Sequence, residues 1–140
     1  MVVKCPYCSK KAELVSGKEI YYLREDLYHR KFWLCRSCNA YVGTFKDGKP
    51  MGSLADAKLR LIRVRTHKCF DSLWQGNFYI MTRTQAYEWL AESLNINIKD
   101  CHIGLFDTEM CKKVIELSRI CYNKALTKHY GRCNIETKSI

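Results

Sequence analysis

Two pairs of cysteines, each with a two-residue spacer, constrain the fold of this chain more than any other feature. Cys5 and Cys8 form the first pair, and Cys35 and Cys38 form the second after an insert of 26 residues. A two-residue spacer allows a tight turn that directs both sulfurs toward one point. Two such turns can surround one metal ion with four thiolates. The four cysteines are therefore predicted to bind one structural Zn²⁺ ion.

Basic residues accompany both cysteine turns. Lys4 and Lys10 lie beside the first turn, and Arg36 lies inside the second. A Zn²⁺ ion held by four thiolates has a net charge of about −2, and neighbouring cations stabilise thiolates. We therefore expect these three residues to offset the charge of the metal centre.

The segment Cys5-Pro6-Tyr7-Cys8 has a second interpretation as a redox-active dithiol, in which the first thiolate lies at a helix N-terminus. Such a domain requires a parallel βαβ unit after the dithiol, whereas Ser16 and Gly17 would interrupt a helix that begins near Ser9. The second cysteine pair would then have no role. Complete disulfide pairing is disfavoured because the chain has nine cysteines, an odd number.

The size and composition of the chain indicate a globular protein with reduced thiols. It has 140 residues, of which 47% are hydrophobic and 12% aromatic, which is enough for one domain or for a metal module joined to a helical region. A module of about fifty residues buries too little apolar surface to be stable by itself, so a stabilising metal ion is expected there. Without a signal peptide or an apolar run of about 18 residues, we expect a cytoplasmic protein with no membrane span.

The residues around the cysteine turns are expected to form the short antiparallel strands of a zinc ribbon, because the better segments are rich in β-branched or aromatic residues. The expected strands are residues 2–4, 12–15, 18–22, 31–34 and 39–43. The aromatic residues of this region are expected to pack over the metal core, with base stacking as the alternative. They are Tyr21, Tyr22, Phe32, Trp33 and Tyr41.

A helix is predicted after the turn at residues 47–50. Ser53 is its expected N-cap, and the helix continues toward Trp74. Its apolar residues fall on two faces separated by basic stripes, which is typical of a helix covered on both sides.

Two further helices are predicted in the second half. Thr82 begins one with the residue pattern of a capping box. Asp107 caps the other, which extends to about Tyr130, with Gly131 at its C-terminal turn. The predicted class is α+β, with a zinc ribbon in residues 1–50 packed on a three-helix region in residues 51–140, together one compact unit.

The order of motifs along the chain resembles a family of small bacterial and phage proteins known as zinc-finger-containing domain proteins. The resemblance covers roughly residues 3–117, and it is specific because the cysteine pairs occur together with three further motifs. These motifs are Leu27-Tyr28-x-Arg30-Lys31-Phe32-Trp33, Leu54-Ala55-Asp56 and Cys101-His102-Ile103-Gly104. The resemblance implies a metal-bound ribbon and a phage or mobile-element setting in a bacterial host cell, but no reaction.

A second group of metal-ligand residues lies in the helical region. Cysteine and histidine can complete a tetrahedral site, and the candidates are His67, Cys101, His102 and Cys111. The adjacent Cys101 and His102 diverge in an extended segment, however, and Cys111 lies on an apolar helix face. The alternative is that these cysteines are buried thiols that pack as small hydrophobic residues.

The formal net charge of +10 favours a polyanionic partner. Most of the excess lies in residues 1–74, which carry fifteen basic and seven acidic side chains. Nucleic acid is the expected partner, with phosphate contacts from the ribbon and the first helix. The expected contact residues are Arg30, Lys31, Arg36, Lys58, Arg60, Arg63 and Arg65.

Two other functions compete with an accessory or regulatory role on nucleic acid. The ribbon could instead present tyrosine and tryptophan to a host protein that it inhibits or redirects. An enzyme is not expected, because the sequence has no phosphate-binding glycine loop, serine elbow or zinc-protease and deaminase signature. A zinc-supported nuclease with His29, His67 or His102 as general base would need further metal ligands. The sequence does not indicate an oligomeric state.

Overall fold

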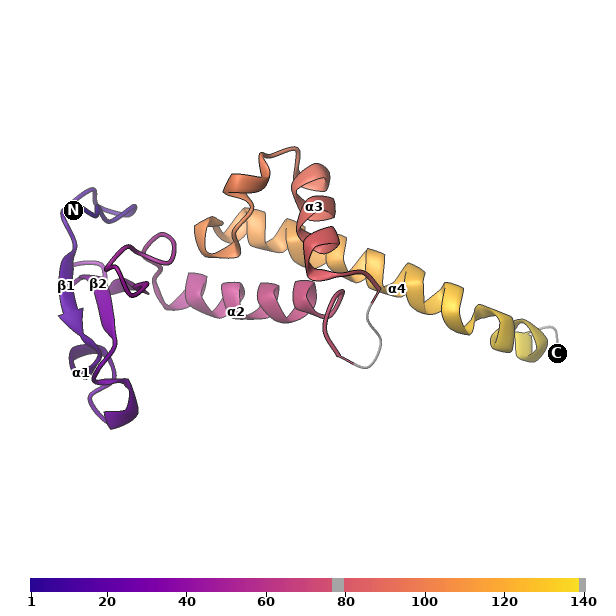
Figure 1. The fold of residues 1–140 in the computed structure, drawn as a ribbon, viewed down its shortest axis with the longest axis horizontal. Helices are drawn as coiled ribbons and strands as arrows, with labels where there is room; N and C mark the ends of the chain where they lie inside the picture. The colour runs from indigo at the N-terminus through magenta and orange to yellow at the C-terminus, as the bar shows by residue number, and fades with distance from the viewer. Residues whose placement is uncertain (77–79, 139–140) are drawn as a thin grey trace. The chain divides into compact units, whose positions relative to one another are not determined.

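A computed structural model describes residues 1–76 and 80–138, with side chains as far as His129. The chain divides into two compact units, one of Met1–Leu61 with His102–Phe106 and one of Ile62–Cys101 with Asp107–Ile140. Strands and helices together confirm the predicted α+β class (Figure 1). In chain order the elements are β1 (Glu13–Ser16), α1 (Gly17–Ile20), η1 (Glu25–Leu27), β2 (Lys31–Cys35), β3 (Ala40–Gly43), α2 (Ala57–Asp71), α3 (Arg83–Leu94), η2 (Ile98–Asp100), η3 (Ile103–Leu105) and α4 (Thr108–Lys138).

The three strands form one antiparallel sheet in the order β1-β2-β3. Successive side chains of a strand point to opposite faces, and β2 shows this alternation. Phe32 and Leu34 pack with Val15 in one buried cluster. Trp33 and Cys35 belong to a second cluster. Both faces of the small sheet are therefore covered, and one of the two clusters contains a predicted metal ligand.

The predicted strand at residues 18–22 is wrong, because residues 17–20 form the single helical turn α1. The reason lies at Gly17, which is buried and whose N–H donates to the carbonyl of Arg30 at 2.7 Å. A Cβ atom at this position would overlap the carbonyl oxygen of Leu27. The close approach of the returning backbone ends β1 and turns the chain away from the sheet.

Helix α2 begins later than the sequence indicates. Ala55 pairs with Tyr41 of β3 through backbone hydrogen bonds of 3.0 and 3.1 Å, so this segment extends the sheet. Asp56, and not the predicted Ser53, caps the helix by accepting from the N–H of Leu59 at 2.9 Å. One predicted apolar face of α2 is exposed, since Leu61 is 57% accessible to solvent, so the expected cover on both sides is not observed.

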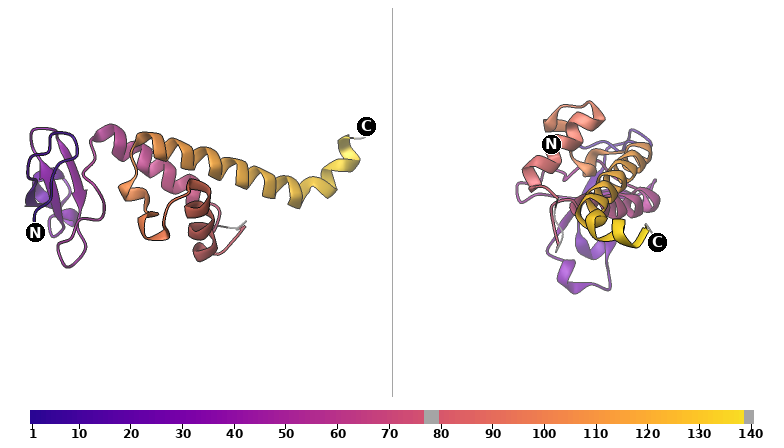
Figure 2. Two further views of the ribbon diagram at one scale, coloured as in Figure 1. Left: turned by 90° about the horizontal axis from the view of Figure 1, so that it is seen from above. Right: turned by 90° about the vertical axis from the view of Figure 1, so that its right-hand side faces the viewer.

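The second unit contains α3, α4 and the C-terminal part of α2. Thr82 accepts from the N–H of Gln85, whose side chain accepts from the N–H of Thr82, so the predicted capping box is confirmed. The predicted cap of α4 is also confirmed, because Asp107 accepts from the N–H of Met110 at 2.8 Å. Helix α4, orange to yellow in Figure 2, continues past the predicted stop at Gly131. An isolated glycine costs about 1 kcal/mol in a helix but does not terminate it.

The core of the second unit joins its helices through aromatic and small side chains. Phe70 of α2 meets Tyr87 of α3 edge to face, with ring centroids 4.9 Å apart. Cys111 of α4 shares a hydrogen bond with Thr66 of α2, and both residues are fully buried. No helix within the described part of the chain is both long enough and apolar enough to cross a membrane.

Candidate metal centre

The sulfurs of Cys5, Cys8, Cys35 and Cys38 all lie within 4.8 Å of one another. The Sγ atoms of Cys8 and Cys35 are 3.6 Å apart, well beyond the roughly 2.05 Å of a disulfide bond, and all four cysteines are free. Four sulfurs about 2.3 Å from a tetrahedral zinc ion would be about 3.8 Å from each other. The donor set and its spacing therefore fit a four-thiolate metal site.

Both cysteine turns close with a residue in the left-handed region of backbone conformation. Ser9 follows the first pair with φ 64°, and Asn39 follows the second with φ 50°. The N–H of Ser9 donates to the carbonyl of Cys5 at 2.8 Å. Asparagine adopts this conformation readily, whereas a left-handed serine is less common. Both turns thus place a left-handed residue directly after their second cysteine, although the second turn closes by a hydrogen bond from the N–H of Asn39 to the carbonyl of Arg36.

The metal centre is part of the hydrophobic core of the first unit. Cys5 and Cys35 are 1% and 4% exposed, and Trp33, Ala40 and Leu54 complete their cluster. Cys8 and Cys38 are half-buried. A metal ion at this position would therefore link the two cysteine turns to the strands and to the segment before α2.

The electrostatics of the four thiols favour a bound cation. The pKa of Cys8 is lowered to about 7, first because the backbone N–H of Lys10 donates to its sulfur. The pKa of Cys38 is raised to about 12, chiefly by its hydrogen bond with Cys8 and by burial. Close thiolates repel one another, so they do not all ionise unaided. A divalent cation supplies the charge that allows all four to act as thiolate ligands.

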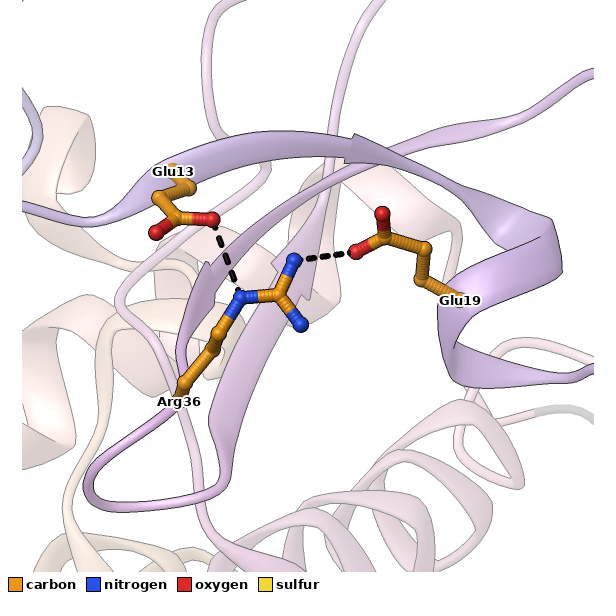
Figure 3. A network of polar contacts seen from close by, with 3 residues as sticks. All are labelled: Glu13, Glu19 and Arg36. Carbon is orange, nitrogen blue, oxygen red and sulfur yellow. Dashed lines mark hydrogen bonds and ion pairs between the residues drawn. The ribbon is translucent and has the colours of Figure 1, made fainter.

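Arg36, which the sequence places among the cations around the metal centre, forms ion pairs within the first unit. Its Nε donates to Glu13 at 3.0 Å and one Nη donates to Glu19 at 2.5 Å, so the guanidinium is held between two carboxylates (Figure 3). These carboxylates balance its positive charge. Lys4 and Lys10 are therefore the remaining cations of the three that were expected to offset the thiolates.

The expected nucleic-acid contacts have different surroundings. Arg30, Lys31, Lys58 and Arg65 are exposed, whereas Arg63 is only 8% exposed. A buried guanidinium of this kind is poorly placed to meet a phosphate.

Arg60 is occupied by contacts within the first unit. Its guanidinium carbon lies 3.8 Å from the ring centroid of Tyr41, and its Nη1 donates to the carbonyl of Ala55 at 2.6 Å. The sequence did not indicate this stack, because eighteen residues separate Tyr41 from Arg60 in the chain.

Lys11 is a cation that the sequence prediction missed. It lies opposite Lys4 in an isolated antiparallel bridge, because the strand segments before and after the first cysteine turn pair there. The turn at Cys5–Cys8 is the sequence signal that could have placed the two lysines together, because it returns the chain antiparallel to itself.

Of the five aromatic residues expected over the metal core, Trp33 belongs to the cluster of the cysteines, whereas Tyr21, Phe32 and Tyr41 pack on one another in the other cluster. Phe32 and Tyr41 have ring centroids 5.9 Å apart, and Tyr21 lies within 6.0 Å of both in edge-to-face geometry. Trp33 is 9% exposed and donates through Nε1 to the carbonyl of Gly48. Tyr22, by contrast, is 70% exposed.

The second candidate metal set gains no support from its geometry. Cys101 is buried with its sulfur 3.9 Å from the carbonyl oxygen of Tyr87, and Cys111 forms a hydrogen bond with the side chain of Thr66. Among the residues that the structure describes, the four N-terminal cysteines form the one group of three or more ligands at coordination distance. A site on His67, Cys101, His102 and Cys111 stays a prediction.

Two cysteine turns on a small antiparallel sheet, with four sulfurs gathered in its core, define a metal-binding module of the zinc-finger type. The chain belongs to a zinc-finger-containing domain family, whose family model matches residues 1–121. This match confirms the expected resemblance and includes α2, α3 and the first part of α4. No curated protein and no solved structure matches the chain.

Proposed function

We propose that the four cysteines bind one structural Zn²⁺ ion and that the first unit uses its basic surface to bind nucleic acid. Zinc prefers tetrahedral thiolate ligands, and four protein ligands leave no position for a reacting water. The centre would therefore stabilise a binding surface, and the protein would act as an accessory or regulatory factor and not as an enzyme.

The observation that carries this proposal is an excess of exposed cations without carboxylate partners. The first unit has twelve lysines and arginines against six acidic residues. Three of its cations are already engaged in ion pairs, namely Arg24, Arg36 and Lys49. Asp56 is engaged as the cap of α2. The acidic residues are thus largely occupied inside the unit.

The remaining exposed cations form what we call the unpaired set. Among the described residues, its members have no carboxylate oxygen within ion-pair distance. They are Lys4, Lys10, Lys11, Lys18, Arg30, Lys31, Lys46 and Lys58. Lys4 and Lys11 face each other across the bridge, and like charges directly opposite destabilise a pair of strands. Phosphate groups would relieve this repulsion, which supports a polyanionic partner.

Fluorescence anisotropy with short labelled single strands and duplexes, measured over a range of salt concentrations, tests the proposal. Phosphate contacts release counterions, so affinity should fall steeply with salt. The triple substitution Arg30→Gln, Lys31→Gln and Lys58→Gln should weaken binding and make the log–log salt slope shallower by about 2–3. The matched control, Lys113→Gln, Lys124→Gln and Lys128→Gln, removes three exposed charges from α4 and should have a smaller effect. Affinity that does not depend on salt would contradict the proposal.

Binding to a host protein is the second candidate function, because two adjacent large side chains are exposed. Tyr22 is 70% and Leu23 is 82% exposed, and such residues can act as interface anchors. Partners that remain on immobilised protein after nuclease treatment, and that are lost with Tyr22→Ser and Leu23→Ser, would favour this function. Partners lost on nuclease treatment would favour nucleic acid.

The proposed setting is a reducing compartment. Eight described cysteines are free, which supports a reducing compartment such as the cytoplasm. The phage or mobile-element setting in a bacterial host stays a prediction from the family resemblance.

A further inference from the structure

An open pocket of about 380 Å³ lies in the first unit beside the second cysteine turn. Leu34 and Tyr41 contribute to the apolar wall of the pocket. The polar lining of the pocket comes from Glu19, Arg36, Asn39 and Arg60. Sites for small ligands have volumes from about 300 Å³ and combine apolar walls with a few placed polar groups. The pocket therefore has the size of a site for one small group, and its lining is mainly polar.

The guanidinium of Arg60 forms a fixed flat surface in this pocket. One of its faces covers the ring of Tyr41 at 3.8 Å, and Nη1 is bonded to the carbonyl of Ala55. Tyr41 is itself held by Tyr21, whose hydroxyl lies 3.1 Å from the Tyr41 hydroxyl. Because these contacts hold the guanidinium in place, little side-chain entropy remains to be lost when a second flat group stacks on it.

Donors and acceptors lie side by side in the polar lining. Arg36 donates to one oxygen of Glu19 and to Glu13, and Figure 3 shows its other Nη nitrogen outside these contacts. The second oxygen of Glu19 remains available as an acceptor among the interactions drawn there. Both carboxylates contact Arg36, and the carboxylate of Glu19 in the pocket lining would repel a phosphate. A neutral group with both donors and acceptors fits this lining better than a phosphate.

We propose that the pocket binds one unpaired nucleobase of a single-stranded segment. This inference rests on the proposed nucleic-acid function and specifies its substrate class. A nucleobase has two flat faces and a polar edge. One face would stack on Arg60, while the edge would meet the carboxylate of Glu19, the guanidinium of Arg36 and the amide of Asn39. In a duplex the same edge is already paired, so single strands should bind more tightly.

Substitution of Arg60 tests the stacking surface. Arg60→Ala should weaken binding of a labelled single strand by about fivefold to 100-fold and leave duplex binding almost unchanged. Lys58→Ala, on the same turn of α2, is the matched control and should weaken single-strand and duplex binding alike. Retained metal content and an unchanged circular dichroism spectrum of Arg60→Ala would establish that the variant is folded.

Substitution of Glu19 separates a base site from a phosphate site. Glu19→Gln removes a negative charge, so it should strengthen binding if the pocket holds phosphate and weaken single-strand binding if it holds a base edge. Arg36 keeps Glu13 as a partner in this variant. Stronger binding by Glu19→Gln, or equal losses of single-strand and duplex affinity for Arg60→Ala, would overturn the base pocket but leave salt-dependent binding intact. Absence of binding to any labelled strand would overturn both proposals.

Discussion

The Sγ atoms of Cys8 and Cys35 lie 3.6 Å apart, although 26 residues separate the two cysteines in the chain. The pairing of β1 with β2 produces this proximity, because Glu13 lies opposite Leu34 and so brings the ends of both cysteine turns together. A metal ion on these sulfurs would close the same loop as the strand pairing does. Metal binding and sheet formation are therefore expected to be coupled.

Removal of the metal should unfold the first unit. We expect one Zn²⁺ per chain, and a chelator or the double substitution Cys5→Ser and Cys35→Ser should remove this metal. The first unit should then unfold, because zinc binding in such modules supplies about 10–16 kcal/mol of apparent free energy. Metal analysis measures the first effect. The near-ultraviolet circular dichroism of the protein minus that of Trp33→Phe gives the Trp33 signal, which measures the second effect, because Trp74 and Trp89 also contribute to the spectrum. Cys69→Ser, at a half-buried cysteine outside the cluster, is the control and should retain the metal. A metal-depleted protein with an unchanged Trp33 signal would contradict the coupling.

Replacement of Gly17 by alanine should destabilise the first unit strongly. The added Cβ would overlap the carbonyl of Leu27, and overpacking against backbone typically costs about 1–3 kcal/mol. Gly43→Ala is the matched control, since its Cβ would meet only ordinary contacts at 3.8 Å. Urea denaturation of the zinc-loaded variants measures the difference in the free energy of unfolding. Equal stability of the two variants would show that the backbone at Gly17 can move aside.

The capping box of α3 should contribute measurably to the stability of the second unit. Thr82→Ala removes the acceptor for the N–H of Gln85 and should lower the free energy of unfolding by about 1 kcal/mol. Thr84→Ala, at an exposed position inside the helix, removes the same atoms without a cap and should not destabilise the helix. Faster hydrogen exchange at the amide of Gln85 in Thr82→Ala alone is the expected result.

Stability at high pH should depend on Tyr41. Its pKa is raised to about 12, first by burial and then by the hydrogen bond with Tyr21, while the charge of Arg60 opposes the shift. The folded protein therefore retains a phenol proton that the unfolded chain loses near pH 10. This contribution is fully present below about pH 10 and is lost as the pH rises toward about 12. The phenolate absorbance of the protein minus that of Tyr41→Phe measures the pKa of Tyr41 in the folded protein. A difference that titrates near pH 10 would refute the raised pKa.

The features that the sequence predicted correctly depend on residues close together in the chain. The spacing of Cys5 and Cys8 sets their turn, and the capping box at Thr82 begins α3 through contacts over three residues. Strand β2 follows from a run of aromatic and other apolar side chains, Phe32, Trp33 and Leu34. Local geometry determines each of these, so the pattern of residue types was sufficient.

The features that the sequence did not predict depend on contacts between distant residues. Gly17 ends β1 because the backbone of Leu27 returns against it, and Ala55 stays in the sheet because Tyr41 offers it hydrogen bonds. The residues next to Gly17 and Ala55 in the sequence do not predict that Leu27 and Tyr41 are their partners.

The charged side chains show the same division. Their number established by itself that the chain is basic and pointed to a polyanionic partner. Only the tertiary structure decided that Arg36 lies between two carboxylates, that Arg63 is buried and that Arg60 stacks on Tyr41. The charge of a side chain belongs to its residue type, whereas its availability to a ligand depends on which neighbours the fold places within a few ångströms.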